Sequence, residues 1–382
     1  MPNSITKPAR LRQFDFFLYA GIFVFLSMLV SCAPSASELE AVDYTPLPGD
    51  DWQLSTPAEQ ELDPMLVAKL YHDAAELETL YGLLVVKDGF LIAEDYFNQG
   101  SVEQKALLQS VAKSITSAQV GIALDRGCLS GVEQKMIDFF PDYADQMADP
   151  RKRQITIQDM LQMRAGFPPE ESDPALWEAV WSGDYLHHLV DFPLTSDPGT
   201  AFQYSNLTAH WLGVIVARAC ETDLESFGQQ YLFDPLGAEI GSWRKDLDGY
   251  NWGAGELHLS ARDAAKFGLL YLNEGLYAGK QIIPADWVRD SLQTYSEHAY
   301  HNIGRFKDIG YGYQWWSATV NDHPVNFAWG HGGQLIVLLD ELDMVVVVTA
   351  DPFYDVYGEE SWQHEKASFD LAGAFIASLP ES

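Results

Sequence analysis

The distribution of strand-forming segments constrains the fold most, because these segments stand near both ends of the chain. Residues 82–97 contain two apolar runs separated by Lys87-Asp88-Gly89, a pattern typical of a β-hairpin. The last third holds four more apolar, aromatic or β-branched segments, at residues 311–317, 326–329, 334–340 and 344–349. The residues between them are mostly helical in pattern. We therefore expect an α+β fold: an antiparallel sheet built from the N- and C-terminal segments, flanked by helices, with a mostly helical inserted domain.

Helix signals set the expected domain limits. Apolar residues recur at helical spacing in residues 57–80, and further helices are expected at about 110–125 and 362–377. Ser260-Ala-Arg-Asp263 predicts a helix start, and Thr156-Ile-Gln-Asp159 predicts a capping box. We expect a sheet domain at residues 57–127 and 251–382, and a helical insertion domain at residues 128–250.

The charge balance excludes some functions. The 382 residues include 23 basic and 55 acidic ones, a net charge of −32, which disfavours binding to the phosphates of nucleic acids. No His-Glu-x-x-His, Gly-x-Ser-x-Gly or complete phosphate-loop motif occurs. We expect no metal and no organic cofactor.

The N-terminal residues 1–31 have the pattern of a secretory signal peptide, with a short basic region followed by an apolar run. The run ends in Leu29-Val30-Ser31-Cys32, which resembles a bacterial lipobox, so Cys32 is the expected lipidation site. The alternative is a plain anchor helix with a chance cysteine. Lipidation predicts a protein anchored in the bacterial cell envelope, in the outer membrane and facing the periplasm, with membrane contact only through the lipid on Cys32.

The residues that follow Cys32 also bear on this prediction. Residues 32–56 are acidic and contain several Pro and Gly residues, which favours a tether. In an oxidising periplasm Cys128 and Cys220 could pair, but two separate buried thiols are an equal alternative.

The main chemical signal is Ser110-Val-Ala-Lys113. A serine hydroxyl must lose its proton to attack a carbonyl group, and a lysine three residues later lies on the same helix face. Apolar neighbours would lower the pKa of the lysine by desolvation. The alternative is a serine that caps the helix beside a solvated lysine.

Two later segments strengthen this signal. Tyr204-Ser205-Asn206 stands at a helix start, where the phenol could relay protons and the amide could contact both the lysine and a substrate. Trp329-Gly-His-Gly-Gly-Gln334 interrupts an apolar strand with glycines, which permit close approach to the backbone.

Taken together, these segments resemble the serine β-lactamase and penicillin-binding-protein-like hydrolases, closest to the class C-like branch with esterases and 6-aminohexanoate-dimer hydrolases. The resemblance covers roughly residues 80–350. It also includes Leu84-Val-Val-Lys-Asp-Gly89, Met160-Leu-Gln-Met-Arg-Ala-Gly166, Ser260-Ala-Arg-Asp-Ala-Ala-Lys-Phe-Gly268 and Tyr311-Gly-Tyr-Gln-Trp-Trp316.

The resemblance implies a role for each matching residue. Ser110 would be the nucleophile, Lys113 its activating base and Tyr204 the second proton-transfer residue. The backbone amides of Ser110 and Gln334 would form the oxyanion hole. The implied substrate-binding residues are Asn206, His331, Gly332 and Gly333. The family fold would place this site between the sheet domain and the helical insertion.

One departure from the family pattern concerns its Lys-Thr-Gly motif. His331 replaces the lysine and Gly332 replaces the threonine, so the positive charge expected for a substrate carboxylate depends on a partner that raises the pKa of His331. This predicts a roomier, less anion-selective pocket with poor β-lactam hydrolysis. Several tryptophans stand in segments expected near the site, and each could line it or belong to the core: Trp177, Trp181, Trp252, Trp315, Trp316 and Trp329.

The predicted function is hydrolysis of a small-molecule ester or amide through an acyl-Ser110 intermediate. One alternative is a peptidoglycan D,D-peptidase or β-lactamase. Another is a catalytically silent periplasmic lipoprotein that binds a ligand in the same site. The sequence leaves the oligomeric state open.

Overall fold

The computed structural model describes residues 34–172, 174–354 and 361–380. The elements below all belong to one compact unit, Ala36–Ser382. The predicted signal peptide and Cys32 lie outside the described residues. Within the described ranges, no helix combines the length and apolarity that a membrane span requires.

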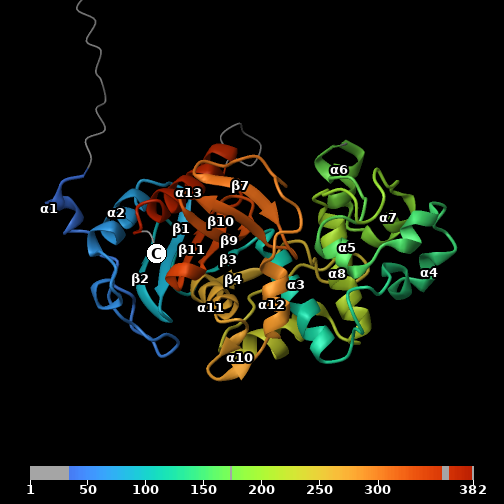
Figure 1. Cartoon of the computed structure of the whole chain (residues 1–382), viewed down its shortest axis with the longest axis horizontal. Helices are drawn as coiled ribbons and strands as arrows, with labels where there is room; N and C mark the ends of the chain where they lie inside the picture. Colours follow the sequence, from blue (N-terminus) through green and yellow to red (C-terminus); the bar gives the residue numbers. More distant parts are fainter. Residues whose placement is uncertain (1–33, 173, 355–360, 381–382) are drawn as a thin grey trace, which may run out of the picture. The chain divides into compact units, whose positions relative to one another are not determined.

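A seven-stranded antiparallel sheet in the order β2-β1-β11-β10-β9-β8-β7 forms the centre of this unit (Figure 1). Two pairs of shorter strands, β3 with β4 and β5 with β6, form separate small sheets. The main strands are β1 (Leu80–Lys87), β2 (Phe90–Tyr96), β7 (Phe306–Tyr311), β8 (Trp316–Val320), β9 (His323–Gly330), β10 (Gln334–Leu339) and β11 (Met344–Ala350). The short strands are β3 (Lys105–Leu107), β4 (His258–Ser260), β5 (Leu276–Tyr277) and β6 (Lys280–Gln281).

Helices connect and cover these strands. The α-helices are α1 (Ala36–Leu39), α2 (Pro64–Ala74), α3 (Val111–Asp125), α4 (Pro141–Ala144), α5 (Ile157–Leu161), α6 (Pro174–Ser182), α7 (Tyr185–Asp191), α8 (Asn206–Ala219), α9 (Leu224–Gly228), α10 (Asp234–Leu236), α11 (Ala261–Leu272), α12 (Ala285–Leu292) and α13 (Ser361–Ile376). The short 3₁₀ segments are η1 (Ala58–Gln60), η2 (Met136–Phe139), η3 (Pro150–Gln154), η4 (Glu170–Ser172) and η6 (Asp340–Leu342), and η5 (Gln229–Phe233) is a π-helix.

The expected α+β fold with a large antiparallel sheet is confirmed. Strands β10 and β11 are buried at every position, because helices cover both faces of the sheet (Figure 1). Helices α2 and α13 pack together and contact β1 and β10, respectively, whereas α11 packs against β1, β10 and β11. An uninterrupted apolar strand is stable only when both of its faces are covered, which explains the sequence of β11. Most of the helices between α4 and α9 gather to one side of the sheet (Figure 1).

Two predicted helix starts are confirmed by their hydrogen bonds. Thr156 and Asp159 form the capping box of α5, with bonds of 2.9 and 3.0 Å. The Ser260 hydroxyl accepts a bond from the backbone N–H of Asp263 at the start of α11, at 3.1 Å. Local side-chain chemistry therefore sets where these helices begin.

The predicted strand at residues 311–317 is wrong. It contains the end of β7, a turn and the start of β8. Gln314 adopts a left-handed backbone conformation, with φ of 62°, so the chain reverses within this aromatic segment.

Part of the segment expected as a tether packs against the sheet unit. Trp52 is buried, and Leu54 forms a parallel bridge with Leu91 in β2. The backbone N–H of Leu47 donates to the Glu94 carboxylate at 2.9 Å. These contacts limit any free tether to residues before this region.

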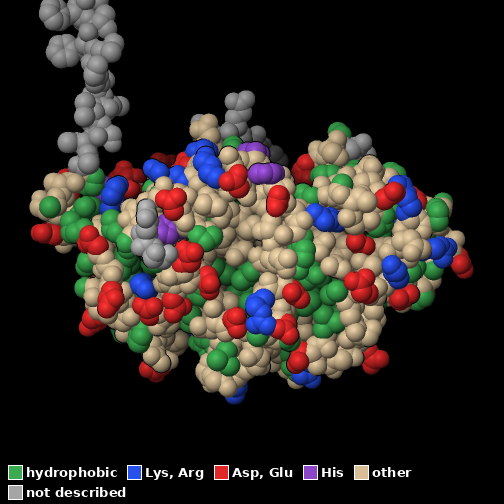
Figure 2. All heavy atoms as spheres, in the orientation of Figure 1, with side chains coloured by type: hydrophobic (Ala, Val, Ile, Leu, Met, Phe, Trp, Pro, Cys, Tyr) green, Lys and Arg blue, Asp and Glu red, His purple; other side chains and the backbone are tan. Residues whose placement is uncertain are grey.

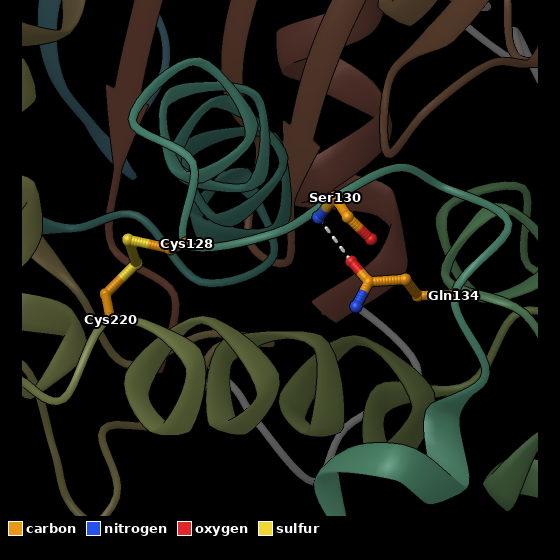
Figure 3. The surroundings of a disulfide bond; sticks show 4 residues. All are labelled: Cys128, Ser130, Gln134 and Cys220. Carbon is orange, nitrogen blue, oxygen red and sulfur yellow. Dashed lines mark hydrogen bonds between the residues drawn. A yellow bond between two sulfur atoms is a disulfide. The ribbon is translucent and has the colours of Figure 1, made fainter.

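A disulfide joins Cys128 and Cys220, whose Cα atoms lie 5.2 Å apart (Figure 3). Cys128 follows α3, and Cys220 caps the C-terminal end of α8. The bond therefore ties together the ends of two helices that pack against each other. Of the two alternatives open from the sequence, the structure has the disulfide.

Acidic side chains are spread over the face of the molecule shown in Figure 2, as the net charge of −32 requires. Among the described residues, no group of three or more His, Cys, Asp or Glu side chains is placed to hold a metal ion.

Candidate active site

Ser110 and Lys113 meet at the N-terminal end of α3. The Lys113 Nζ atom lies 2.7 Å from the Ser110 Oγ atom. Ser110 is the N-cap residue but makes no capping hydrogen bond, and Lys113 is only 1% exposed. The alternative of a capping serine beside a solvated lysine is therefore wrong. The preceding residue, Gln109, has a left-handed φ of 48°, a conformation often found beside functional sites.

Two further oxygen atoms surround the Lys113 amine. Nζ donates to Asn206 Oδ1 and to the backbone carbonyl of Ala254, both at 2.8 Å. These oxygens can only accept hydrogen bonds. When the amine is neutral, its two hydrogens satisfy them and its lone pair is left for the Ser110 hydroxyl. The geometry thus orients a base toward a nucleophile.

The environment of Lys113 makes this neutral form accessible. Burial lowers the pKa of Lys113 to about 7, although the charges of Glu170 and Glu171 oppose the shift. Desolvation disfavours the ammonium form, as the apolar neighbours on α3 predict. A large fraction of the amine is therefore unprotonated at neutral pH.

Tyr204 lies next to this pair, immediately before α8. The Lys113 Nζ atom is 4.9 Å from the centre of the Tyr204 ring. Burial raises the pKa of Tyr204, and its interaction with the Ser110 side chain lowers it only in part. Burial has the largest effect, and the charges of nearby carboxylates raise the pKa of Tyr204 further. Tyr204 is thus a protonated phenol at neutral pH and suits a proton donor.

Glu170 holds the start of α8 and has no motif in the sequence that would have marked it. Its buried carboxylate accepts bonds from the Ser205 hydroxyl at 2.7 Å and from the backbone N–H groups of Asn206 at 2.9 Å and Leu207 at 3.0 Å. A carboxylate at a helix N-terminus satisfies otherwise unpaired N–H groups. Glu170 therefore fixes Asn206, which in turn binds Lys113.

A buried pair supports the other acceptor of Lys113. His210 Nε2 lies 2.9 Å from Asp246 Oδ2, and the backbone N–H of Gly253 donates to His210 Nδ1 at 3.4 Å. Burial lowers the pKa of His210, so the ring is neutral, donating through Nε2 and accepting through Nδ1. Because His210 holds Gly253, this pair also positions the next residue, Ala254, whose carbonyl oxygen accepts a hydrogen bond from Lys113.

The Trp329–Gln334 segment, which joins β9 to β10, lies against the residues that precede Ser110. A Cβ atom on Gly330 would stand 2.2 Å from the backbone oxygen of Leu108, so only glycine permits this approach. The Gln334 side chain is buried and bonds the backbone of Ala350 in both directions, at 2.8 and 3.0 Å. These contacts fix the backbone at Gln334, where the resemblance predicts an oxyanion-hole amide.

Gly332 and Gly333 have backbone conformations and surroundings that favour glycine, and their predicted contact with substrate stays a prediction. Both have positive φ angles, 81° and 92°. A Cβ atom added to Gly332 would lie 2.4 Å from the backbone of Pro352, and one added to Gly333 would lie 2.3 Å from the Ser368 hydroxyl oxygen. The glycines permit a tight turn packed on protein atoms, rather than leaving room at these Cβ positions for a substrate.

His331 is paired with an acidic side chain that raises its pKa, as a charged histidine at this position requires. Its Nδ1 atom lies 2.9 Å from Glu365 Oε2, and this pairing raises the pKa of His331. Glu365 is nearly buried in α13 and also accepts bonds from Trp329 Nε1 at 2.7 Å and from the Gly332 N–H at 2.9 Å. Nothing in the sequence marks Glu365, which lies 34 residues after His331.

The tryptophans divide between core and site. Trp252 and Trp315 are buried among other aromatic rings, whereas Trp316, which is also buried, stacks on Tyr204 and contacts Trp329. Trp177 is 39% exposed, and the Trp181 side chain lies outside the described part.

A cavity of about 820 Å³ lies away from the candidate site, between α12 and strands β8 and β9. The predicted site residues do not line it.

This geometry defines a class of protein with a buried lysine and a phenol beside a partly exposed serine, close to the turn that joins two strands of an antiparallel sheet. The chain belongs to the family described as Beta-lactamase, which it matches over residues 81–366. It is 27% identical over 289 residues to the 6-aminohexanoate-dimer hydrolase of Paenarthrobacter ureafaciens, covering 71% of this chain and 72% of that protein.

Solved structures share the fold at lower identity. The octameric penicillin-binding protein homologue from Pyrococcus abyssi superposes with a TM-score of 0.62 and 18% identity, over 80% of this chain and 76% of that one. EstCE1, a hydrolase with promiscuous acyltransferase activity, superposes with a TM-score of 0.63 and 16% identity, over 80% and 97% of the two chains.

Proposed function

We propose that this protein is a serine hydrolase that cleaves a small-molecule ester or amide through an acyl-Ser110 intermediate. The single observation that supports this most is the environment of Lys113, whose two fixed acceptors direct its lone pair at the Ser110 hydroxyl. The family relatives described as hydrolases favour the same chemistry.

In the proposed reaction, neutral Lys113 takes the Ser110 proton while Oγ attacks the substrate carbonyl carbon. The backbone amides of Ser110 and Gln334 bind the oxyanion of the tetrahedral intermediate. Tyr204 gives its proton to the leaving group and regains one from the Lys113 ammonium. Water then attacks the acyl-enzyme, with the same groups acting in reverse order.

The test is the Ser110→Ala variant. We expect it to lose p-nitrophenyl acetate hydrolysis by on the order of a thousandfold or more, with unchanged circular dichroism. Ser117→Ala is the matched control, because this serine lies on the same helix and its buried hydroxyl has no hydrogen-bond partner among the described residues. Undiminished turnover by Ser110→Ala would falsify the proposal. A fluorophosphonate probe that fails to label the wild type would favour the silent binding protein.

One observation favours a second candidate, a D,D-peptidase or β-lactamase. A protonated His331 could meet a substrate carboxylate where the family has lysine. However, Glu365 already neutralises that charge, so we rank this candidate second. Nitrocefin turnover as fast as that of the ester would reverse the order.

We also propose that the protein is anchored through a lipid on Cys32 and faces the periplasm. The disulfide favours an oxidising compartment. Incorporation of labelled palmitate that Cys32→Ser abolishes would support this location. Absence of label in the wild type would contradict it.

A further inference from the structure

A continuous set of aromatic rings extends from Tyr204. Tyr204 stacks on Trp316, with ring centroids 5.4 Å apart and planes at 28°. Trp316 contacts Trp329 and Tyr300, at centroid distances of 5.3 and 5.9 Å. Trp329 lies 5.3 Å from Tyr300 and 6.3 Å from Trp362. We name these five residues the aromatic wall.

The aromatic wall runs from the interior to the surface. Trp316 is 4% exposed, whereas Tyr300 is 36% and Trp362 38% exposed. The five rings come from separate segments, including β8, β9 and α13, so no single amphipathic element accounts for them. Trp329 is held in place by the bond from its indole N–H to Glu365. A fixed apolar surface that leads outward from a catalytic phenol is suited to bind part of a substrate.

The charges near the aromatic wall select against anions. Burial raises the pKa of Tyr204 most, and the nearby carboxylates of Glu171, Glu170 and Glu365 raise it further; burial also raises the pKa of Tyr300 most, with Glu365 and Glu171 adding to it. Two histidines lie beside these rings: His331 is paired with Glu365, and the His301 ring lies 4.1 Å from that of Tyr300 and 6.2 Å from that of Trp362. An anionic group beside Tyr204 would be repelled by these three carboxylates, whereas a neutral aryl group would gain edge-to-face and stacking contacts along the wall.

We propose that the aromatic wall binds an aryl leaving group, the alcohol or amine half of a neutral ester or amide. This inference rests on the proposed function, in which Tyr204 protonates the leaving group and must therefore contact it. The Ser110 Oγ–carbonyl carbon bond forms, and the bond from that carbon to the aryl alcohol oxygen breaks. The alcohol leaves with the Tyr204 proton, and the Lys113 ammonium returns the serine proton to Tyr204.

The test compares two esters that form the same acetyl-enzyme, ethyl acetate and 2-naphthylmethyl acetate. The value of kcat/KM reports the steps through acylation, and the intrinsic reactivity of the two esters is the same for every variant. A change in the ratio of their kcat/KM values between wild type and variant therefore reports leaving-group binding. We expect the wild type to prefer the naphthylmethyl ester, and Trp362→Ala or Tyr300→Ala to lower the ratio roughly fivefold. Trp362→Phe should retain most of it. Leu276→Ala, which removes a 46% exposed side chain on β5, should leave it unchanged.

An unchanged ratio in both alanine variants would overturn the proposal. Ethyl 2-naphthylacetate carries the aryl group on its acyl half instead. If the alanine variants lose kcat/KM only for this ester, the wall binds the acyl group and the proposal is overturned. A binding assay separates this inference from the proposed function. In the Ser110→Ala background, 2-naphthylmethanol should quench tryptophan fluorescence and bind roughly fivefold more weakly after Trp362→Ala. If that holds while the wild type hydrolyses neither ester, the hydrolase proposal fails but the aryl site stands. Equal binding by the two proteins contradicts the site.

Discussion

Glu365 Oε2 lies 2.9 Å from Nδ1 of His331, although one residue belongs to α13 and the other to the turn between β9 and β10. The same carboxylate accepts two more hydrogen bonds within the Trp329–Gln334 segment. A residue of the last helix thus organises a strand turn at the candidate active site. It also determines the charge of the histidine that replaces the family's lysine.

Glu365→Gln should lower the pKa of His331, because the pairing with Glu365 raises it. A raised pKa stabilises the fold below the ordinary histidine value, and this contribution is lost as pH rises through the folded value. Glu365→Gln should therefore lack the part of the pH dependence of the unfolding free energy that comes from His331. An NMR titration of the His331 ring measures the shift, with Asp322→Asn, at the exposed turn before β9, as control. An unmoved titration would contradict the role of Glu365.

The activity of the wild type should fall about tenfold per pH unit below pH 7, because the ammonium form of Lys113 cannot accept the serine proton. Lys113→Ala should lower kcat by roughly 10²–10⁴-fold and remove this acidic limb. Initial rates with p-nitrophenyl acetate across pH 5–9 measure both effects. An acidic limb of unchanged shape in the variant argues against Lys113 as the base.

Glu170→Gln should move the acidic limb toward lower pH. The charge of Glu170 raises the pKa of Lys113, so its removal disfavours the ammonium form further. Weaker bonds to Ser205, Asn206 and Leu207 should also lower the unfolding free energy by roughly 1–3 kcal/mol. The pH–rate profile and urea unfolding report the two effects separately. If Glu170→Gln lowers stability but the acidic limb of the pH–rate profile does not move, Glu170 has only a structural role.

Replacing both Cys128 and Cys220 with serine should lower the unfolding free energy by roughly 3–5 kcal/mol, because the disulfide closes a long loop whose ends have a sequence separation of 92. The N-terminal ends of α3 and α8 carry Lys113 and Asn206, so looser packing of these helices should also reduce kcat. Urea unfolding and initial rates test this. A difference under about 1 kcal/mol from the oxidised wild type contradicts it.

Most of the sheet could be predicted from the sequence because its strands are long, apolar and β-branched. The strand at 311–317 was misplaced, since aromatic residues continue through a turn at Gln314. The three-residue strands β3 and β4 gave no periodic signal, because they depend on pairing with each other.

The sequence alone determined the candidate nucleophile and base, since Ser110 and Lys113 are one helical turn apart and their proximity follows from local geometry. Only the tertiary structure decided what surrounds them: the carboxylates of Glu170 and Glu365, the Ala254 carbonyl and the aromatic wall. Those groups come from distant segments, and no local pattern records which of them meet. The pKa of a buried amine depends on all of these neighbours together, so the chemistry of Lys113 is a property of the packed chain.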